Sequence, residues 1–295
     1  MPARPNGSGA ELSSEEEEKA VSTTTEVGGR ERLARVVPDA IAAIHEVLAR
    51  HQVTEDEWYA ALEFLTQVGQ HDEFILLSDV TRTSVLIDGL SHGADGSATA
   101  SDVEGPLYRP DPPWREAPVK IYEDYEGVEE GEVLFVRGRV TSTDGAALPD
   151  AVLDIWQTGP SGGYDIWDER QPDFNFRGRF GVAQSGDYEF QTMIPKPYTV
   201  PTDGPVGRYL DAMGQHPWRP AHIHFKVTAE GHEPLVTQLF FAGDPYLEND
   251  TIGAVKQALV RSPEKHGDEA ELRERGLDAA FFTCDFDIRL RPLGA

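Results

Sequence analysis

Between residues 30 and about 93, the hydrophobic positions recur at the spacing of an α-helix. Ile41, Ile44 and Leu48 would share one side of such a helix. Residues 74–90 repeat this kind of pattern and predict a further helix. Stripes of this type are core positions in most proteins, and they also suit packing against a second copy of the chain. We therefore expect a helical region at this end of the sequence.

A helix start is indicated at residues 54–57, which read TEDE. This matches a capping box, in which the first and fourth residues each satisfy a backbone N–H group of the other. Trp58, Leu62 and Leu65 follow as an apolar stripe. A second helix is therefore predicted from about residue 55.

From residue 102 onward, prolines and glycines punctuate short runs that favour strands. Phe282, Cys284 and Phe286 alternate with polar residues, which is the period of a half-buried strand. Further strands are predicted at residues 132–141, 151–156, 187–193, 221–229 and 235–242. Residues 253–266 are expected to form a helix. Many short strands separated by turn signals predict an antiparallel β-sandwich.

The predicted organisation is therefore mainly β, with an N-terminal helical region. Residues 1–29 are rich in Ser, Gly and Glu and have few large apolar side chains, so we expect a disordered acidic tail. Residues 30–100 form the helical, dimerising region of this scheme. Residues 101–295 form the β-sandwich domain that carries the chemistry.

Composition narrows the possible partners. The formal net charge of -26 argues against nucleic acid, whose phosphates call for clustered Lys and Arg. Cys284 is the single cysteine, so an intramolecular disulfide cannot form. No apolar stretch is long enough to span a bilayer, and no signal-peptide pattern begins the sequence. These features predict cytoplasmic residence.

The sharpest local signal for chemistry is His222-Ile223-His224. Residues two apart in a strand point to the same side, so both imidazoles would project together. Imidazole is a common ligand for iron, zinc and copper. Taken alone, the pattern also fits a pair of hydrogen-bonded strand histidines.

Two tyrosines lie upstream of this pair in stiff or tightly turning segments. Tyr198 stands between Pro197 and Pro201, and Tyr164 follows two glycines in a predicted loop. Taken singly, each is more often a structural aromatic whose hydroxyl bonds to the backbone. The glycine- and proline-rich context also fits ordinary turns.

Together these segments resemble the intradiol ring-cleaving dioxygenases, the family of catechol 1,2-dioxygenase and hydroxyquinol 1,2-dioxygenase. The likeness covers most of the chain after the tail. It is carried by GPLYRPDPPW at residues 105–114, LDIWQ at 153–157, PTDGPVG at 201–207 and HPWRPAHIHF at 216–225. The resemblance implies a non-haem Fe(III) enzyme that uses O2 to split an aromatic 1,2-diol between its hydroxyl-bearing carbons.

The resemblance also implies roles for particular residues. The metal ligands would be Tyr164, Tyr198, His222 and His224. Phenolates are hard anionic donors and favour ferric iron. Tyr198 would also leave the metal on substrate binding and take up a substrate proton. Arg219 would stabilise charge developing on the ring, and Gln238 would lie beside the oxygen-reaction site; an Arg in an ion pair and a plain strand glutamine are the alternatives.

The substrate pocket would be formed by two segments. The implied lining residues are Leu76, Asp79, Val103, Gly105, Pro106, Leu107 and Tyr108. An acidic residue at Asp79 is similar to the hydroxyquinol enzymes, where a carboxylate can accept a hydrogen bond from a third hydroxyl. The sequence VEGPLY is closer to the catechol enzymes. Catechol, hydroxyquinol and substituted catechols therefore all stay open as substrates.

The resemblance further implies a homodimer formed through the N-terminal helices, with the possibility of a bound phospholipid. Two other interpretations compete with the main one. A ferrous extradiol dioxygenase would cleave beside the diol, and a β-sandwich binding module would have no catalysis. Colour separates the first alternative, because tyrosinate bound to Fe(III) absorbs visible light, and iron content separates the second.

Overall fold

The computed structural model describes residues 29–93, 96–128 and 131–294. The predicted disordered tail lies outside the described residues, except for Gly29, which begins a helix. The chain divides into two compact units, and the boundary between them falls between Phe64 and Leu65. Each unit is described by itself below.

The first unit contains α2 (Gly29–His51) and the start of α3 (Glu55–Gln70). The predicted capping box is confirmed at the start of α3. The backbone N–H of Thr54 donates to Glu57 Oε2 at 2.8 Å, and the backbone N–H of Glu57 donates to Thr54 Oγ1 at 3.3 Å. These bonds satisfy N–H groups that the helix itself leaves unpaired.

The apolar side of α2 is exposed among the described residues. α2 has no buried residue, and Ile44 is 51% exposed. The other exposed apolar residues of this unit are Leu33, Val36, Val37, Ile41, Val47, Val53, Trp58, Tyr59 and Leu62. An amphipathic helix gains most of its stability by burying its apolar side. The pattern predicted from sequence is present, but within the described residues no side chain of α2 is buried.

The second unit begins with helices that differ from the prediction. The single helix expected over residues 74–90 is wrong: α4 (Phe74–Val80) and α5 (Thr83–His92) are separate. Arg82, between them, has a φ of 61°, a left-handed conformation that cannot continue a right-handed helix. The apolar spacing runs across the break and so concealed it. No helix in the described parts of the chain is long and apolar enough to cross a membrane.

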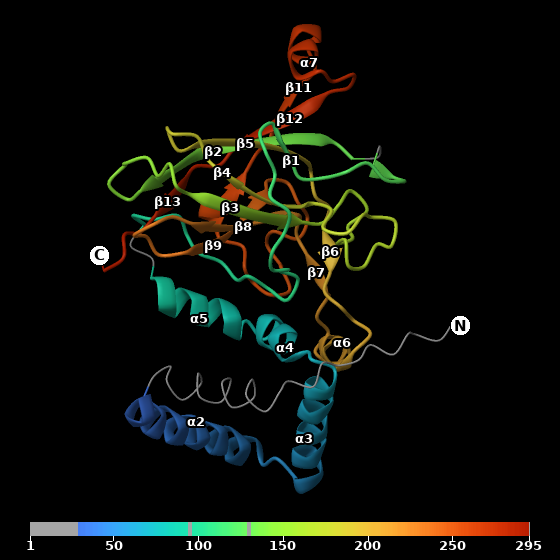
Figure 1. Cartoon of the computed structure of the whole chain (residues 1–295). Helices are drawn as coiled ribbons and strands as arrows, with labels where there is room; N and C mark the ends of the chain where they lie inside the picture. The colour runs from blue at the N-terminus through green and yellow to red at the C-terminus, as the bar shows by residue number, and fades with distance from the viewer. Residues whose placement is uncertain (1–28, 94–95, 129–130, 295) are drawn as a thin grey trace. The chain divides into compact units, whose positions relative to one another are not determined.

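Two sheets make up most of the second unit (Figure 1). The larger sheet has the order β1 (Val119–Lys120), β5 (Asp187–Met193), β2 (Val133–Ser142), β12 (Phe281–Asp285), β11 (Glu264–His266), and β13 (Ile288–Leu290) also pairs with β2. The other sheet has the order β10 (Val260–Arg261), β9 (Leu235–Phe241), β8 (His222–Thr228), β3 (Val152–Gln157), β4 (Arg177–Gly181). A short ribbon pairs β6 (Tyr198–Thr199) with β7 (Trp218–Arg219).

The sheets are mixed. The central pairs β2–β5, β3–β8 and β8–β9 are antiparallel, whereas β1–β5, β12–β2, β13–β2 and β10–β9 are parallel. The predicted antiparallel β-sandwich is therefore not confirmed as stated. Residue alternation reveals that a segment is a strand, but it carries no information about the direction of its partner.

The helix expected over residues 253–266 is also wrong. That segment contains a 3-10 turn, η2 (Gln257–Leu259), followed by β10 and β11. Two helices were not predicted: α6 (Pro205–Ala212), which begins with proline, and α7 (Glu269–Arg275), which has its own capping box at Asp268. Proline suits the first position of a helix because its missing N–H would be unpaired there.

Aromatic side chains connect the two sheets. Phe190 of β5 lies 6.0 Å from Phe225 of β8, and 5.5 Å from Phe180 of β4, between ring centroids. β8 lies between β3 and β9, and its first four residues are all buried. A strand covered on both faces can hold polar side chains away from water, and this is where the two candidate histidines lie.

Candidate metal centre

Four side chains predicted from sequence lie close together in the second unit. His222 and His224 occupy alternate positions on β8, so they project from the same side of the strand. Tyr198 begins β6 and is paired in register with Arg219 of β7. Tyr164 comes from the loop that follows β3. The rings of Tyr164 and Tyr198 lie 5.5 Å apart, and those of Tyr198 and His222 also lie 5.5 Å apart.

The two imidazoles point the same nitrogen toward each other. His222 Nε2 lies 3.1 Å from His224 Nε2. His222 Nδ1 lies 2.7 Å from the carbonyl oxygen of Pro220, which can only accept, so Nδ1 carries the proton. The Nε2 atom of His222 therefore carries a lone pair that is directed into the site. Metal-binding histidines commonly have this arrangement.

His224 is positioned by its neighbour on the next strand. Its ring stacks on Trp156 of β3 at 4.6 Å with an interplanar angle of 5°. Burial lowers the pKa of His224 well below its usual value, and the nearby His222 lowers it further. Burial likewise lowers the pKa of His222, with Arg219 adding to the effect. Both imidazoles are therefore neutral at neutral pH, the form in which they can bind a metal.

Tyr164 is fully buried, and its hydroxyl makes no hydrogen bond of normal geometry with the described residues. Burial raises its pKa well above the usual value, and the neighbouring Tyr198 raises it further. A buried polar atom without a partner is costly, and a phenolate here would need a cation beside it. The unpaired phenol and the facing Nε2 atoms fit a metal ion bound by two tyrosines and two histidines.

A buried ion-pair network that sequence reasoning missed supports the Tyr164 loop. Asp165, the next residue, accepts a hydrogen bond from Arg177 Nε at 2.7 Å and also pairs with Arg109. Arg177 Nη1 donates to the carbonyl oxygen of Leu107 at 2.8 Å. The guanidinium of Arg177 also lies 5.4 Å from the centre of the Tyr164 ring. Arg177 therefore holds both the loop that carries Tyr164 and the segment around Leu107.

Arg219 and Gln238 also lie at the site, as predicted. Arg219 Nη1 lies 3.1 Å from His222 Nε2 and 3.5 Å from the Tyr198 hydroxyl. Arg219 Nη2 donates to Gln238 Oε1 at 3.0 Å. Gln238 Nε2 donates in turn to the carbonyl oxygen of Val103 at 2.9 Å. Both side chains are buried, so their hydrogen bonds fix a cation and an amide beside the histidines.

A small pocket opens beside these residues. Its lining is Leu76, Asp79, Glu104, Gly105, Pro106, Leu107, Tyr198, Val200, Pro201, Arg219, His224 and Ile252. Five of the predicted pocket residues are in this set. Val103 and Tyr108 are not: Val103 accepts from Gln238 through its carbonyl, and Tyr108 packs edge-on against Trp156 at 4.9 Å.

Two carboxylates face this pocket. Asp79 of α4 is 3% exposed, and burial raises its pKa. Glu104, which sequence analysis did not select, accepts a hydrogen bond from Lys226 at 2.8 Å. Glu104 is the second residue of the VEGPLY segment, but its partner on β8 was not visible in the sequence. The pocket is therefore lined by two carboxylates as well as by Tyr198 and His224.

The donor set has a specific composition. Among the described residues, no group of three or more His, Cys, Asp or Glu side chains lies close enough to hold a metal ion. The histidine pair is instead completed by phenols. A site of two histidines and one carboxylate, typical of ferrous oxygenases, is therefore not found in these parts of the chain.

Comparison with known proteins establishes the family of this chain. A family described as catechol dioxygenase N terminus matches residues 30–99, and a family described as dioxygenase matches residues 103–292. Both lie in the order in which the helices and sheets occur. The chain belongs to the intradiol dioxygenase family, which is iron-dependent.

Individual relatives agree with this membership. The chain is 38% identical over 266 residues to a hydroxyquinol 1,2-dioxygenase of Rhizobium sp. (strain MTP-10005), covering 88% of this chain and 89% of that protein. It is 35% identical to a chlorocatechol 1,2-dioxygenase of Cupriavidus pinatubonensis, covering 78% and 88%. Among solved structures, catechol 1,2-dioxygenase from Acinetobacter sp. ADP1 matches with a TM-score of 0.81 at 29% identity, covering 93% and 91%.

Proposed function

We propose that this chain cleaves a catechol-type aromatic 1,2-diol with O2 between its two hydroxyl-bearing carbons, giving a cis,cis-muconate-type dicarboxylic acid. The observation that carries the proposal is the convergence of two neutral imidazoles and two phenols in one buried site. Family membership and the names of the relatives support the same reaction class.

The metal in this proposal is Fe(III), held by Tyr164, Tyr198, His222 and His224. Ferric iron, when bound, supplies a Lewis acid that withdraws electron density from the diol. Two phenolates and two neutral imidazoles would leave a charge near +1 on the centre, which favours an anionic diol. The buried Tyr164 hydroxyl, which has no hydrogen-bond partner among the described residues, supports a metal ion beside it.

The remaining site residues take roles that their contacts suit. Tyr198 lines the pocket and touches Arg219, so it can accept a proton from the diol as the substrate enters. Arg219 Nη1 points at the space between Tyr198 and His222, where a donor can stabilise negative charge on the ring. Gln238 fixes Arg219 Nη2 and the Val103 carbonyl.

Hydroxyquinol is the substrate that this pocket suits best, with catechol next. The buried carboxylate of Asp79 can accept a hydrogen bond from a third ring hydroxyl, which catechol lacks. The relative from Rhizobium sp. (strain MTP-10005) is a hydroxyquinol 1,2-dioxygenase, whereas the relative from Cupriavidus pinatubonensis is a chlorocatechol 1,2-dioxygenase. Two acidic side chains at the pocket also disfavour diols with a carboxylate substituent.

The test is a panel of diols, with oxygen uptake and the ultraviolet spectra of the products as readouts. Tyr164→Phe removes one proposed ligand and is expected to abolish iron binding, the burgundy colour and activity together. Tyr122→Phe is the matched control, because Tyr122 is also buried but its hydroxyl accepts a hydrogen bond from Gln191. Full activity in Tyr164→Phe would refute the assignment.

The same measurements separate the alternatives. A ferrous extradiol dioxygenase would be colourless and would give a product cleaved beside the diol. A β-sandwich module without catalysis would bind no iron and consume no oxygen. About one iron per chain is expected, because the residues supply one set of ligands.

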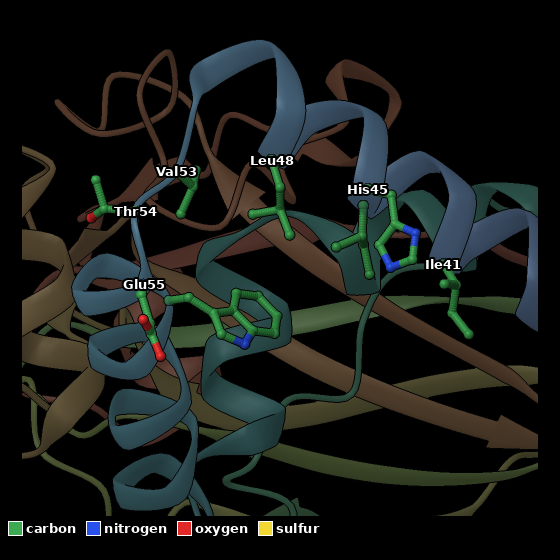
Figure 2. A pocket seen from close by; sticks show the side chains of 8 residues that line it. Ile41, His45, Leu48, Val53, Thr54 and Glu55 are labelled. Atoms are coloured by element: carbon green, nitrogen blue, oxygen red, sulfur yellow. The ribbon is translucent and has the colours of Figure 1, made fainter.

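We also propose that the chain is a homodimer formed through its N-terminal helices. The exposed apolar side of α2 supports this, because a solvent-exposed stripe of this length is unfavourable in water. A pocket of about 490 Å³ lies within the first unit, lined by Ile41, Ile44, His45, Leu48, Val53, Thr54, Glu55 and Trp58. Figure 2 shows Ile41, His45 and Leu48 on α2, and Glu55 at the start of the next helix.

The apolar lining of that pocket suits a phospholipid acyl chain, which we propose as its occupant. Lipid extraction followed by mass spectrometry of the purified protein tests this directly. The proposed organisation is an acidic tail at residues 1–29, a dimerising region at 30–100 and a sandwich-like catalytic domain at 101–295. We propose that the protein resides in the cytoplasm. Limited proteolysis with mass analysis of the fragments tests these boundaries.

A further inference from the structure

The guanidinium of Arg219 is buried and held by other side chains on each of its edges. Its side chain is 4% exposed. Nε donates to Asp250 Oδ1 at 3.2 Å, and Nη2 donates both to Asp250 Oδ2 at 3.4 Å and to Gln238 Oε1 at 3.0 Å. Nη1 alone is directed toward Tyr198 and His222. The guanidinium is planar, so fixing two of its nitrogens fixes the direction of the third.

Asp250 is itself held in place by the turn in which it lies. Its carboxylate accepts backbone N–H bonds from Ile252 at 3.4 Å and from Ala254 at 3.0 Å. Its side chain is 1% exposed. Because both oxygens have backbone donors, the carboxylate cannot rotate away from Arg219 without breaking the turn. The direction of Arg219 Nη1 is therefore set by a residue distant from it in sequence.

The ion pair between Arg219 and Asp250 also stabilises the positive charge of Arg219. A buried arginine without a partner is strongly unfavourable, whereas a paired one can be accommodated. Burial acts to lower the pKa of Arg219, but Asp250 and Tyr198 hold that pKa above its usual value. Arg219 therefore remains a cation next to the histidines.

We propose that Asp250 is a positioning residue that acts through Arg219, aiming its Nη1 donor at the metal centre. The proposal rests on the role given to Arg219 in the proposed function. It also assigns Asp250 a task beyond capping its own turn. The same turn carries Ile252, which lines the pocket, so the experiment must separate an effect through Arg219 from a shift of the pocket wall.

A double-mutant cycle makes that separation. Arg219→Gln, Asp250→Asn and the double variant are compared with the unchanged protein, with kcat expressed per bound iron. We expect Arg219→Gln to lower kcat about a hundredfold and Asp250→Asn to lower it about tenfold. If Asp250 acts through Arg219, the double variant should be no slower than Arg219→Gln alone, at about a hundredfold.

Asp244→Asn is the matched control. Asp244 also accepts backbone N–H bonds, from Ala221 at 2.9 Å and Tyr246 at 2.9 Å, but no hydrogen bond or ion pair joins it to Arg219. We expect its kcat per iron to stay within about threefold of the unchanged protein. A tenfold loss in this variant would mean that any disturbed turn nearby lowers kcat, which would overturn the assignment of Asp250.

The outcomes of the cycle separate this proposal from the proposed function. If Arg219→Gln keeps full kcat, the role of Arg219 fails and the positioning role fails with it. If Arg219→Gln is impaired but Asp250→Asn is not, only the positioning role fails. If the double variant shows the product of the two losses, about a thousandfold, Asp250 acts independently of Arg219 and the proposal is overturned.

Thermal unfolding of the iron-loaded variants gives a readout that does not depend on turnover. Asp250→Asn leaves a buried arginine without its charged partner, so its unfolding midpoint should fall by several degrees. The double variant removes both charges and should recover part of that loss. This also covers the case in which Asp250→Asn alone does not fold. A double variant less stable than Asp250→Asn would contradict the pairing.

Discussion

The first unit and the candidate metal centre both depart from the usual distribution of side chains. The first unit exposes apolar side chains, whereas the candidate metal centre buries charged and polar ones. In the first unit, α2 presents apolar residues to solvent and has no buried residue. At the metal centre, charged and polar side chains such as Arg219, Asp250 and Gln238 are almost completely buried. Most folded proteins do neither on this scale. Each departure is unfavourable for an isolated chain and requires a compensating interaction.

The compensation differs between the two regions. At the candidate metal centre it lies within the chain, because Arg177 and Arg219 each pair with a buried aspartate, and the Tyr164 hydroxyl, which has no hydrogen-bond partner among the described residues, suits a metal ion. In the first unit no such partner lies within the described residues, where no side chain of α2 is buried, and the proposed dimer would supply one. The comparison therefore sets a candidate site with internal partners in one region against a proposed interface in the other.

The largest expected effect comes from removing a proposed metal ligand. His224→Ala should lower kcat more than about a thousandfold, because a bound metal contributes several kcal/mol to catalysis. Iron content and visible absorption should fall with it. The control His232→Ala removes a histidine whose Nδ1 contacts only the carbonyl of Glu230. An iron-loaded, active His224→Ala protein would contradict the site.

The proposed dimer interface in the first unit is expected to give the next largest effect. Ile44→Asp places a charge within the exposed apolar stripe, and burying that charge should weaken the dimer about a hundredfold. Sedimentation velocity over a range of concentrations measures this. Arg50→Asp introduces the same residue on α2 at an exposed position paired only with Glu46. Equal weakening by both variants would argue against the apolar stripe as the interface.

Substrate preference should respond to Asp79 by a smaller factor. Asp79→Leu removes the proposed acceptor of the third hydroxyl, worth about 2 kcal/mol for a hydrogen bond to a charged group. The ratio of kcat/KM for hydroxyquinol to that for catechol should therefore fall about thirtyfold. Glu104→Gln is the comparison variant. An equal fall in Glu104→Gln would show that the charge of the pocket, not Asp79, sets the ratio.

The last prediction concerns the stability of the polar interior and not catalysis or binding. Burial raises the pKa of Asp102 from 3.8 to about 7, so the folded protein holds this proton over a range in which the unfolded chain has lost it. Between about pH 4 and 7, the contribution of Asp102 to stability therefore falls as pH rises, by at most about 1.4 kcal/mol per pH unit.

Asp102→Asn should remove this contribution and leave the protein at least as stable at pH 8. Its amide oxygen can keep the hydrogen bond that Asp102 accepts from the backbone N–H of Val103. Urea unfolding of both proteins at several pH values measures the difference. A difference that does not change between pH 5 and pH 8 would contradict a raised pKa at Asp102.

Local chemistry explains which features could be predicted from the sequence. The capping box at Thr54 and the strand character of β5 and β8 depend on residues close together in the chain. The projection of His222 and His224 to one side follows from the period of a strand. The ligand set itself came from family resemblance, which draws on more than local physics.

The features that were missed depend on contacts between distant residues. Asp250 meets Arg219 across 31 positions, and Glu104 meets Lys226 across 122. The break at Arg82 depends on one backbone conformation that apolar spacing does not reveal. Residues 253–266 were expected to be helical, although their backbone instead pairs with β9 and β12. Strand pairing of this kind is set by the fold and not by the segment alone.

Anomalous X-ray scattering at the iron edge, from crystals of the iron-loaded protein, tests the central claim most directly. The account predicts one strong peak per chain, within bonding distance of the hydroxyl oxygens of Tyr164 and Tyr198 and of Nε2 of His222 and His224. A peak bound by carboxylates, or a peak away from these four atoms, would contradict it.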